Sequence, residues 1–325
     1  MKLNGNYPVK GEKYGLRNRS GFLNEIRGKR TLYLMVLPAM LIVFLMSYIP
    51  MSGIILAFKN YRYDAGIFGS EWAGNLGLGN FRYFFLSGTG WQVTKNTIFY
   101  NLLNLFTSQA IAIGIALLLS EISGKFYKKL SQSVIFLPYF ISWVIVGAFI
   151  YNIFDFEKGQ MNTFLKLINM QPVNMYSVPW AWIIVICVFN SWKWVGYGSV
   201  IYIAAIAGID VECFEAADLD GANLWKRIRY ITLPGIMNTI VIIFLLNIGR
   251  ILRGDFQMFY QIIGNNGQLF STTDVIDTFV FRSLINSGDI GMPAAASFYQ
   301  SVFCFITIMV VNGLIKRYDN DYALF

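Results

Sequence analysis

Long apolar stretches without charged residues alternate with polar segments along most of the chain. The runs cover residues 31–58, 96–120, 130–154, 167–209, 230–249 and 290–315, and only Lys193 interrupts them. Each run can supply the roughly 20 residues that a helix needs to cross a bilayer. Backbone polar groups cannot stay unpaired in lipid, and the alternation of a membrane barrel is absent. The pattern predicts an all-α, polytopic membrane protein with six transmembrane helices, near 32–57, 96–120, 131–154, 179–208, 233–252 and 293–315.

Composition narrows the function classes. Of the 325 residues, 56% are hydrophobic and 14% are charged. In a soluble domain, roughly a quarter of the residues are charged. There is no histidine, and the three cysteines are scattered along the chain. The chain therefore lacks the residues needed for a zinc site, a disulfide framework, or Cys–His or Ser–His catalysis. We expect no metal site, no catalytic residues and no enzyme activity in this chain.

The distribution of Lys and Arg predicts the orientation. With the N-terminus inside, the predicted cytoplasmic segments hold sixteen of these residues and the much longer outer segments hold nine. Both termini are therefore predicted to be cytoplasmic. Residues 1–31 are predicted to form a basic cytoplasmic tail, and residues 32–325 the membrane domain. A basic tail can bind nucleic acid, but before a membrane span it is better explained as a topology signal held against anionic lipid.

The polar loop at residues 209–233 lies between the fourth and fifth predicted spans. Glu215, Ala216 and Ala217 are followed by Gly221 and then by Leu233-Pro234. Alanine favours a short helix, glycine permits the turn after it, and proline suits the first turn of the next helix. The acidic side chains can bind a partner, whereas the cluster of Lys226, Arg227 and Arg229 is expected near lipid headgroups.

This spacing resembles the cytoplasmic loop of permease subunits in binding-protein-dependent ATP-binding-cassette (ABC) importers. In that family the loop contacts the ATPase. The resemblance implies that the ATPase-coupling residues are Glu215, Ala216, Ala217, Asp218, Asp220, Gly221, Leu233 and Pro234. An ordinary amphipathic loop would explain the Glu-Ala-Ala triplet alone, but not the full spacing at the predicted cytoplasmic position.

The resemblance continues along most of the chain. G-L-G-N-F-R-Y-F-F (77–85), L-P-Y-F-I-S-W (137–143), W-K-W-V-G (192–196) and D-V-I-D-T-F-V-F-R (274–282) are similar to the sugar-uptake branch of the family. They resemble the maltose-permease-like subunits and their relatives for complex oligosaccharides, including the alginate importer. This implies a type I ABC importer permease fold in the bacterial inner membrane, working by alternating access.

The resemblance also implies the partners: a second permease subunit in a heterodimer, two ATPase subunits and an extracytoplasmic solute-binding protein. The chain contains no G-x-x-x-x-G-K-[ST] phosphate-binding loop. We therefore expect no cofactor on this chain, with ATP and Mg bound by the partner ATPase. The alternative is an ion-coupled secondary sugar transporter. That class normally carries intramembrane carboxylates and repeated halves, and no Asp or Glu lies well inside a predicted span.

A candidate substrate pathway follows from the depth of polar residues. Helix rise places Lys193, Arg250 and Gln300 about 24–25 Å above the cytoplasmic interface. Their polar and aromatic neighbours are Asn190, Trp192, Trp194, Tyr197, Asn247 and Tyr299. Aromatic faces and hydrogen bonds suit a sugar, and two cations suit an acidic oligosaccharide such as an alginate or pectin fragment. The alternative is that both cations snorkel to the interface.

Three patterns predict local structure. Thr97, Asn101, Asn104 and Ser108 form a stripe at helical spacing, which predicts a polar seam between helices. Residues 264–267, G-N-N-G, predict a turn. Residues 274–282 predict an amphipathic helix at the surface.

Overall fold

The structure is a computed structural model, and it describes residues 29–74, 76–122 and 124–318. Most of the predicted basic tail lies outside these residues. The described residues form two compact units that divide after residue 53, and we describe them separately. The first unit contains helix α2 (Arg30–Val43) and the π-helical turn η1 (Phe44–Tyr48). Neither has a buried residue, and an apolar helix of this kind is typical of a membrane span.

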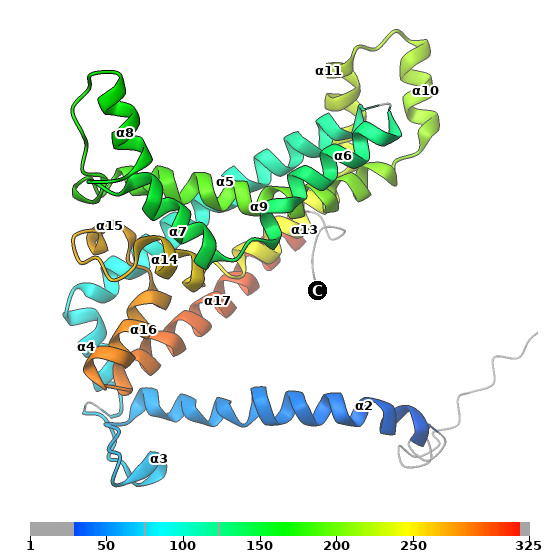
Figure 1. The fold of residues 1–325 in the computed structure, drawn as a ribbon. Coiled ribbons are helices and arrows are strands. Elements are labelled where there is room, and N and C mark those ends of the chain that lie inside the picture. Colours follow the sequence, from blue (N-terminus) through cyan, green and yellow to red (C-terminus); the bar gives the residue numbers. More distant parts are fainter. Residues whose placement is uncertain (1–28, 75, 123, 319–325) are drawn as a thin grey trace, which may run out of the picture. The chain divides into compact units, whose positions relative to one another are not determined.

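Helices of very different lengths build the second unit (Figure 1). The three long ones are α5 (Thr89–Ser120), α9 (Ala181–Ala207) and α17 (Gly291–Tyr318). The shorter α-helices are α3 (Gly66–Gly69), α4 (Gly79–Leu86), α6 (Lys125–Phe136), α7 (Trp143–Phe154), α8 (Gln160–Leu167), α10 (Val211–Leu219), α11 (Leu224–Arg227), α12 (Leu233–Gly235), α13 (Met237–Ile248), α14 (Phe256–Ile263), α15 (Phe270–Thr273) and α16 (Ile276–Ser287). The 3₁₀ and π-helical segments are η2 (Pro50–Phe58, which begins before this unit), η3 (Leu137–Phe140), η4 (Met175–Ser177) and η5 (Ile228–Thr232). No strand occurs among the described residues, which confirms the all-α class.

The number of membrane spans depends on how two bent helix pairs are counted. Within the described ranges, four helices are long and apolar enough to cross a membrane: Arg30–Phe58, Thr89–Ser120, Ala181–Ala207 and Gly291–Arg317. Lys125–Phe140 with Trp143–Phe154, and Leu224–Gly235 with Met237–Ile248, qualify only as pairs. If each pair is one span, the total is the predicted six.

The prediction of one continuous helix in each of these two places is wrong, because each pair is bent. The first pair meets at 89° and the second at 58°. In the first, Pro138 opens a 3₁₀ turn, and the Ser142 side chain then accepts a bond from the Ile145 backbone at 3.4 Å and starts a new helix. Helix α5 also begins before the predicted residue 96, because Lys95 ends the charge-free run without ending the helix.

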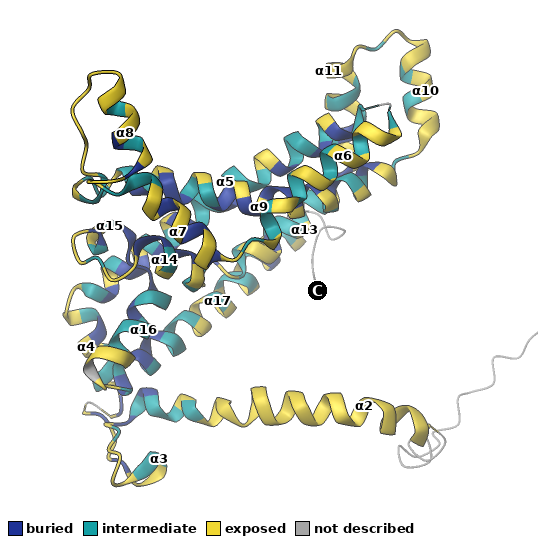
Figure 2. Cartoon of the chain, in the orientation of Figure 1, coloured by how far each residue is buried: buried dark blue, intermediate teal, exposed yellow. Residues whose placement is uncertain are grey.

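Three clusters of buried side chains hold the long helices together. Figure 2 marks the buried positions along these helices in dark blue. Ala112 and Ala116 of α5 pack with Val195 and Tyr202 of α9 at one end. Toward the other end, Tyr100 of α5 packs with side chains of α7, α9 and α14. A third cluster joins α5 with α4, α16 and α17. Helix α5 contributes to all three clusters and is therefore the central element of this unit.

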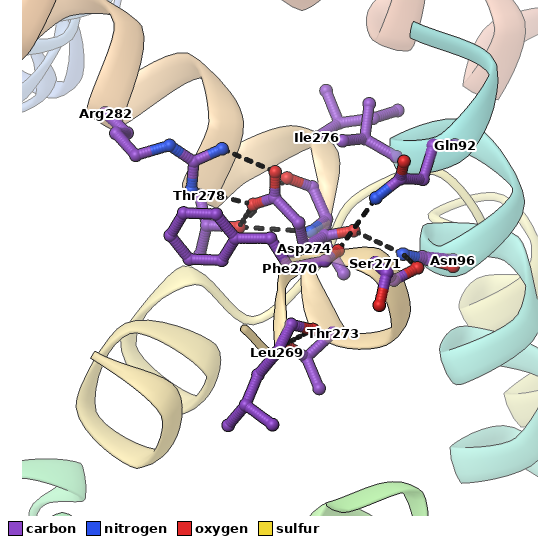
Figure 3. A network of polar contacts seen from close by, with 12 residues as sticks. Gln92, Asn96, Leu269, Phe270, Ser271, Thr273, Asp274, Ile276, Thr278 and Arg282 are labelled. Atoms are coloured by element: carbon purple, nitrogen blue, oxygen red, sulfur yellow. Dashed lines mark hydrogen bonds and ion pairs between the residues drawn. The ribbon is translucent and has the colours of Figure 1, made fainter. Parts of the chain in front are cut away.

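A polar network fixes the short helices α15 and α16 against α5 (Figure 3). Arg282 donates to both oxygens of Asp274, at 3.1 and 2.5 Å, and lies 3.9 Å from the ring centre of Phe270. Gln92 and Asn96 of α5 donate to backbone carbonyls of residues 270, 271 and 274. The predicted surface helix and the turn at 264–267 are both confirmed.

The predicted polar seam on α5 is confirmed at Thr97, Asn101 and Ser108, whereas the buried Asn104 side-chain oxygen has no hydrogen-bond partner among the described residues. The Thr97 hydroxyl accepts from the Ile276 backbone at 3.0 Å, and Asn101 donates to the Ile251 carbonyl at 2.8 Å. Ser108 accepts from Asn190 of α9 at 3.2 Å. Each bond joins α5 to a segment distant in sequence, as small polar residues in membrane helices commonly do.

Candidate functional site

The loop between α9 and α13 folds into two short helices joined by a tight turn. Asp210 caps α10 through the Glu212 backbone, and Asn223 caps α11 through the Lys226 backbone. Gly221 adopts φ +68°, the left-handed conformation that favours glycine. The Ala222 backbone N–H donates to the Ala217 carbonyl at 2.9 Å, which closes the end of α10 as a Schellman motif. The spacing from Ala217 to Gly221 is thus the spacing of a helix and its terminating turn.

Helix α10 exposes a surface suited to a partner. It has no buried residue, and Glu215, Ala216, Asp218 and Asp220 are all exposed. Leu219 is 90% exposed, and Trp225 of α11 is 76% exposed. Leu233 and Pro234 follow after the π-helical turn, where Pro234 occupies the first turn of α12. An apolar side chain ringed by acids at the tip of a loop is typical of an interface rather than of a lipid-facing helix.

One arginine connects this loop to the helix bundle. Arg227 donates to Asp218 of α10 at 2.7 Å and to Glu121, which follows the last residue of α5, at 2.6 Å. A cavity of about 330 Å³ lies between α10 and the bundle. Phe214 of α10 and Ile203 of α9 are among its lining residues.

The predicted pathway residue Lys193 is buried within the bundle, with 6% of its surface exposed. Its ammonium donates to the carbonyls of Tyr139, at 3.1 Å, and Ile141. A third, longer contact at 3.5 Å reaches the Pro138 carbonyl. These carbonyls belong to the bend between α6 and α7, where regular helix bonding stops. The ammonium therefore sits against the break in the neighbouring span.

Two further residues complete this arrangement. The Lys193 ammonium lies 5.3 Å from the ring centre of Trp143, the first residue of α7. The Trp143 indole in turn donates to Asp255, at the start of α14, at 3.0 Å. Lys193 thus links α9 to the bend, and Trp143 links the bend to α14.

The other predicted pathway residues fall into separate groups. Trp192, Trp194 and Tyr197 of α9 are partly exposed, and the Tyr197 ring stacks on Tyr139 with centroids 4.9 Å apart. Asn247 and Arg250 are exposed at the end of α13. Asn190 is buried and bonds Ser108 of α5.

Two predicted pathway residues on α17 make internal contacts. The Gln300 amide donates to the Leu252 carbonyl at 2.6 Å and to Asp277 of α16 at 3.0 Å. Tyr299 packs edge-on against Phe85 at 5.1 Å. These contacts hold α17 against α4 and α16.

Sequence reasoning missed Glu121, Tyr139 and Asp255. A signal existed for Glu121, since an acid at the end of a helix is unfavourable to the helix dipole unless a cation compensates it. Tyr139 and Asp255 acquire their positions only through the bend, which the charge-free run concealed.

Comparison with known proteins identifies the class. Residues 110–320 match the family of binding-protein-dependent transport system inner membrane components. This chain belongs to that family, and it is an ABC importer permease with the type I fold. The matched region contains the whole loop at 209–233.

Its relatives confirm the predicted resemblance to the sugar branch. The chain is 30% identical to protein LplB of Bacillus subtilis, over 92% of this chain and 93% of the relative. It is also 30% identical to the polygalacturonan/rhamnogalacturonan transport system permease YteP of Bacillus subtilis, over 93% of each. Among solved structures it is similar to a chain of the bacterial alginate ABC transporter in complex with an alginate pentasaccharide-bound periplasmic protein, with a TM-score of 0.81, 28% identity and coverage of 91% and 97% of the two chains.

Proposed function

We propose that this chain forms one half of the translocation pathway of an importer for acidic oligosaccharides. A solute-binding protein delivers the sugar, and a separate ATPase drives the transport. The observation that carries the proposal is helix α10, an exposed helix with Leu219 at its tip, held on a loop of the family's spacing. A secondary transporter has no need of such a surface.

The partners follow from the same loop. A second permease completes the pathway, and two ATPase subunits bind ATP and Mg and receive α10 of each permease. Both termini and α10 are cytoplasmic, as the Lys and Arg distribution predicts. This chain binds no cofactor of its own.

Two relatives support an acidic sugar as the substrate. One is named as a permease for polygalacturonan and rhamnogalacturonan, and the other belongs to an alginate importer. All three polymers carry carboxylates. Arg250 is exposed at the end of α13, where its guanidinium is free to pair with a carboxylate of the substrate.

We propose different roles for the predicted pathway residues according to their exposure. The exposed side chains contact the sugar: Trp192, Trp194, Tyr197, Asn247 and Arg250. The buried or bonded ones hold the helices that carry them: Asn190, Lys193, Tyr299 and Gln300.

Copurification tests the proposed coupling. The chain is expressed with its second permease and a tagged ATPase, and the ATPase is captured. We expect Leu219→Asp to abolish recovery of the permease, because it places a charge at the centre of the apolar contact. Leu284→Asp is the control, since Leu284 is also exposed but lies on α16. Full recovery of Leu219→Asp would refute the docking surface.

ATP hydrolysis tests the substrate. The purified complex is mixed with binding protein loaded with trigalacturonate or with maltotriose. We expect trigalacturonate to raise the hydrolysis rate more than maltotriose does, and Arg250→Ala to reduce this difference. A larger response to maltotriose would overturn the acidic substrate and leave the coupling surface standing.

A further inference from the structure

Two helices of this protein carry an acidic residue at or next to their C-terminal end, and both acids bind the same guanidinium. Asp218 lies in the last turn of α10, and Glu121 directly follows α5. A helix C-terminus carries partial negative charge, so a carboxylate there is unfavourable and a cation is favourable. The positive charge of Arg227 compensates the negative charges of both acids, and it lies near the C-terminal ends of two helices, which a cation stabilises.

This shared arginine is the main polar connection that the structure describes between α10 and the bundle. Helix α10 buries no residue of its own, and the cavity of about 330 Å³ separates it from α5 and α9. Dense packing, which transmits movement between most helices, is therefore missing at this place. A rigid arginine fork with a carboxylate at each side is the contact left to transmit it.

The two ion pairs differ in exposure. Arg227 and Glu121 are 23% and 27% exposed at their side chains, whereas Asp218 is 59% exposed. Screening by water weakens the Asp218 pair more. The Glu121 pair is thus the stronger of the two ion pairs, and the Asp218 pair is the weaker.

We propose that Arg227 is a positioning residue that carries the movement of α10 to the end of α5. This inference rests on the proposed coupling function of the loop. Since α5 contributes to all three buried clusters, a displacement of its end reaches the whole bundle. Arg227 thereby connects the ATPase surface to the transport pathway.

Transport stoichiometry tests the inference in the reconstituted importer with trigalacturonate as the probe. We expect Arg227→Gln and Glu121→Gln to lower the sugar moved per ATP by about five-fold, with ATPase binding retained. Asp218→Asn should have a smaller effect, in line with its exposure. Arg229→Gln is the matched control, because Arg229 is exposed and stacks on Tyr230, 5.8 Å away.

The double variant Glu121→Gln with Arg227→Gln separates a shared contact from two independent ones. If the two residues act as one link, the double variant loses no more than Arg227→Gln alone. Additive losses would overturn the proposal. So would unchanged stoichiometry in Arg227→Gln, or a loss of ATPase binding, which would make Arg227 part of the docking surface.

A distance measurement tests the link when the probe sugar is not transported. Spin labels are placed on Cys213 of α10 and on Leu118→Cys of α5, both exposed positions, with Cys187 and Cys304 replaced by alanine. We expect one narrow distance that ATP does not change in the parent, and a broad distribution in Arg227→Gln. A narrow distance in Arg227→Gln would refute the inference. Failure of the parent to transport trigalacturonate would count against the proposed substrate only.

Discussion

Replacing Lys193 by methionine distinguishes a structural cation from a sugar-binding one. Methionine keeps the unbranched stem and removes the ammonium. The carbonyls of Tyr139 and Ile141 then lose their donor, whereas the Pro138 carbonyl keeps the Ile141 backbone N–H at 3.1 Å. Two half-buried acceptors are therefore left unpaired at the bend.

The magnitude follows from these two carbonyls. An unpaired buried carbonyl costs about 1–3 kcal/mol, so the pair costs about 2–6 kcal/mol. Removing a buried charge recovers part of this, because the ammonium no longer has to be desolvated. We expect a net loss of about 3 kcal/mol, which corresponds to a Tm lowered by roughly 5 °C for a chain of this size.

The assay is thermal unfolding of the purified permease complex in detergent, with transport measured on the same preparation. Lys166→Met is the matched control, because Lys166 is exposed on α8 and its replacement should leave the Tm unchanged. A Lys193→Met variant with the parental Tm and impaired transport would refute the structural role. It would show that Lys193 acts on the sugar directly.

Three further changes test the packing and the polar network. Gly196→Ala should lower the Tm strongly, since its Cβ would clash with the Ile135 backbone carbonyl, whereas Gly114→Ala, with nothing within 4 Å, should not. Arg282→Lys should lower the free energy of unfolding by about 1–2 kcal/mol, because lysine cannot reproduce the two parallel bonds from arginine to Asp274. Unfolding measured in the presence of salt tests this loss. Burial raises the pKa of the Asp277 carboxyl above its ordinary value, so its stabilising contribution is full at low pH and is lost as pH rises through the raised pKa. Asp277→Asn should therefore flatten this part of the pH dependence of the Tm.

The Tm values of the glycine, Arg282 and Asp277 variants can also contradict these expectations. Equal Tm values for the two glycine variants would mean that α9 shifts freely against the bend. An unchanged Arg282→Lys protein would show that the network adds no stability at the surface. A Tm that falls with rising pH equally in Asp277→Asn and in the parent would assign the titration to another group.

Spans and the coupling loop were predictable because lipid and turn geometry impose strict local rules. A membrane helix needs a long run without charge, and the spans predicted from such runs match α9 and α17 to within three residues, whereas α5 begins seven residues earlier than predicted. The end of α10 requires a left-handed residue, and the glycine at 221 marks it. Both features depend on residues close together in the chain.

The role of Lys193 was not predictable in this way. Helix rise gives its depth along α9 but not the direction in which the ammonium points. That direction is determined by the bend at residues 137–142, a different span that supplies unpaired carbonyls. Pro138 and Ser142 were signals for the bend, but nothing local to Lys193 indicates that it faces them.

Three cations that are neighbours in the sequence have different surroundings in the structure. Lys226, Arg227 and Arg229 form one basic cluster in the chain and were all expected near lipid headgroups. In the structure Lys226 and Arg229 are exposed, but Arg227 turns toward Glu121 and Asp218. A headgroup role needs only positive charge, so lysine can replace the exposed Arg229, whereas two carboxylates at one side chain need the arginine fork. Arg227→Lys should therefore weaken coupling where Arg229→Lys does not, and equal coupling in both would return Arg227 to the headgroup cluster.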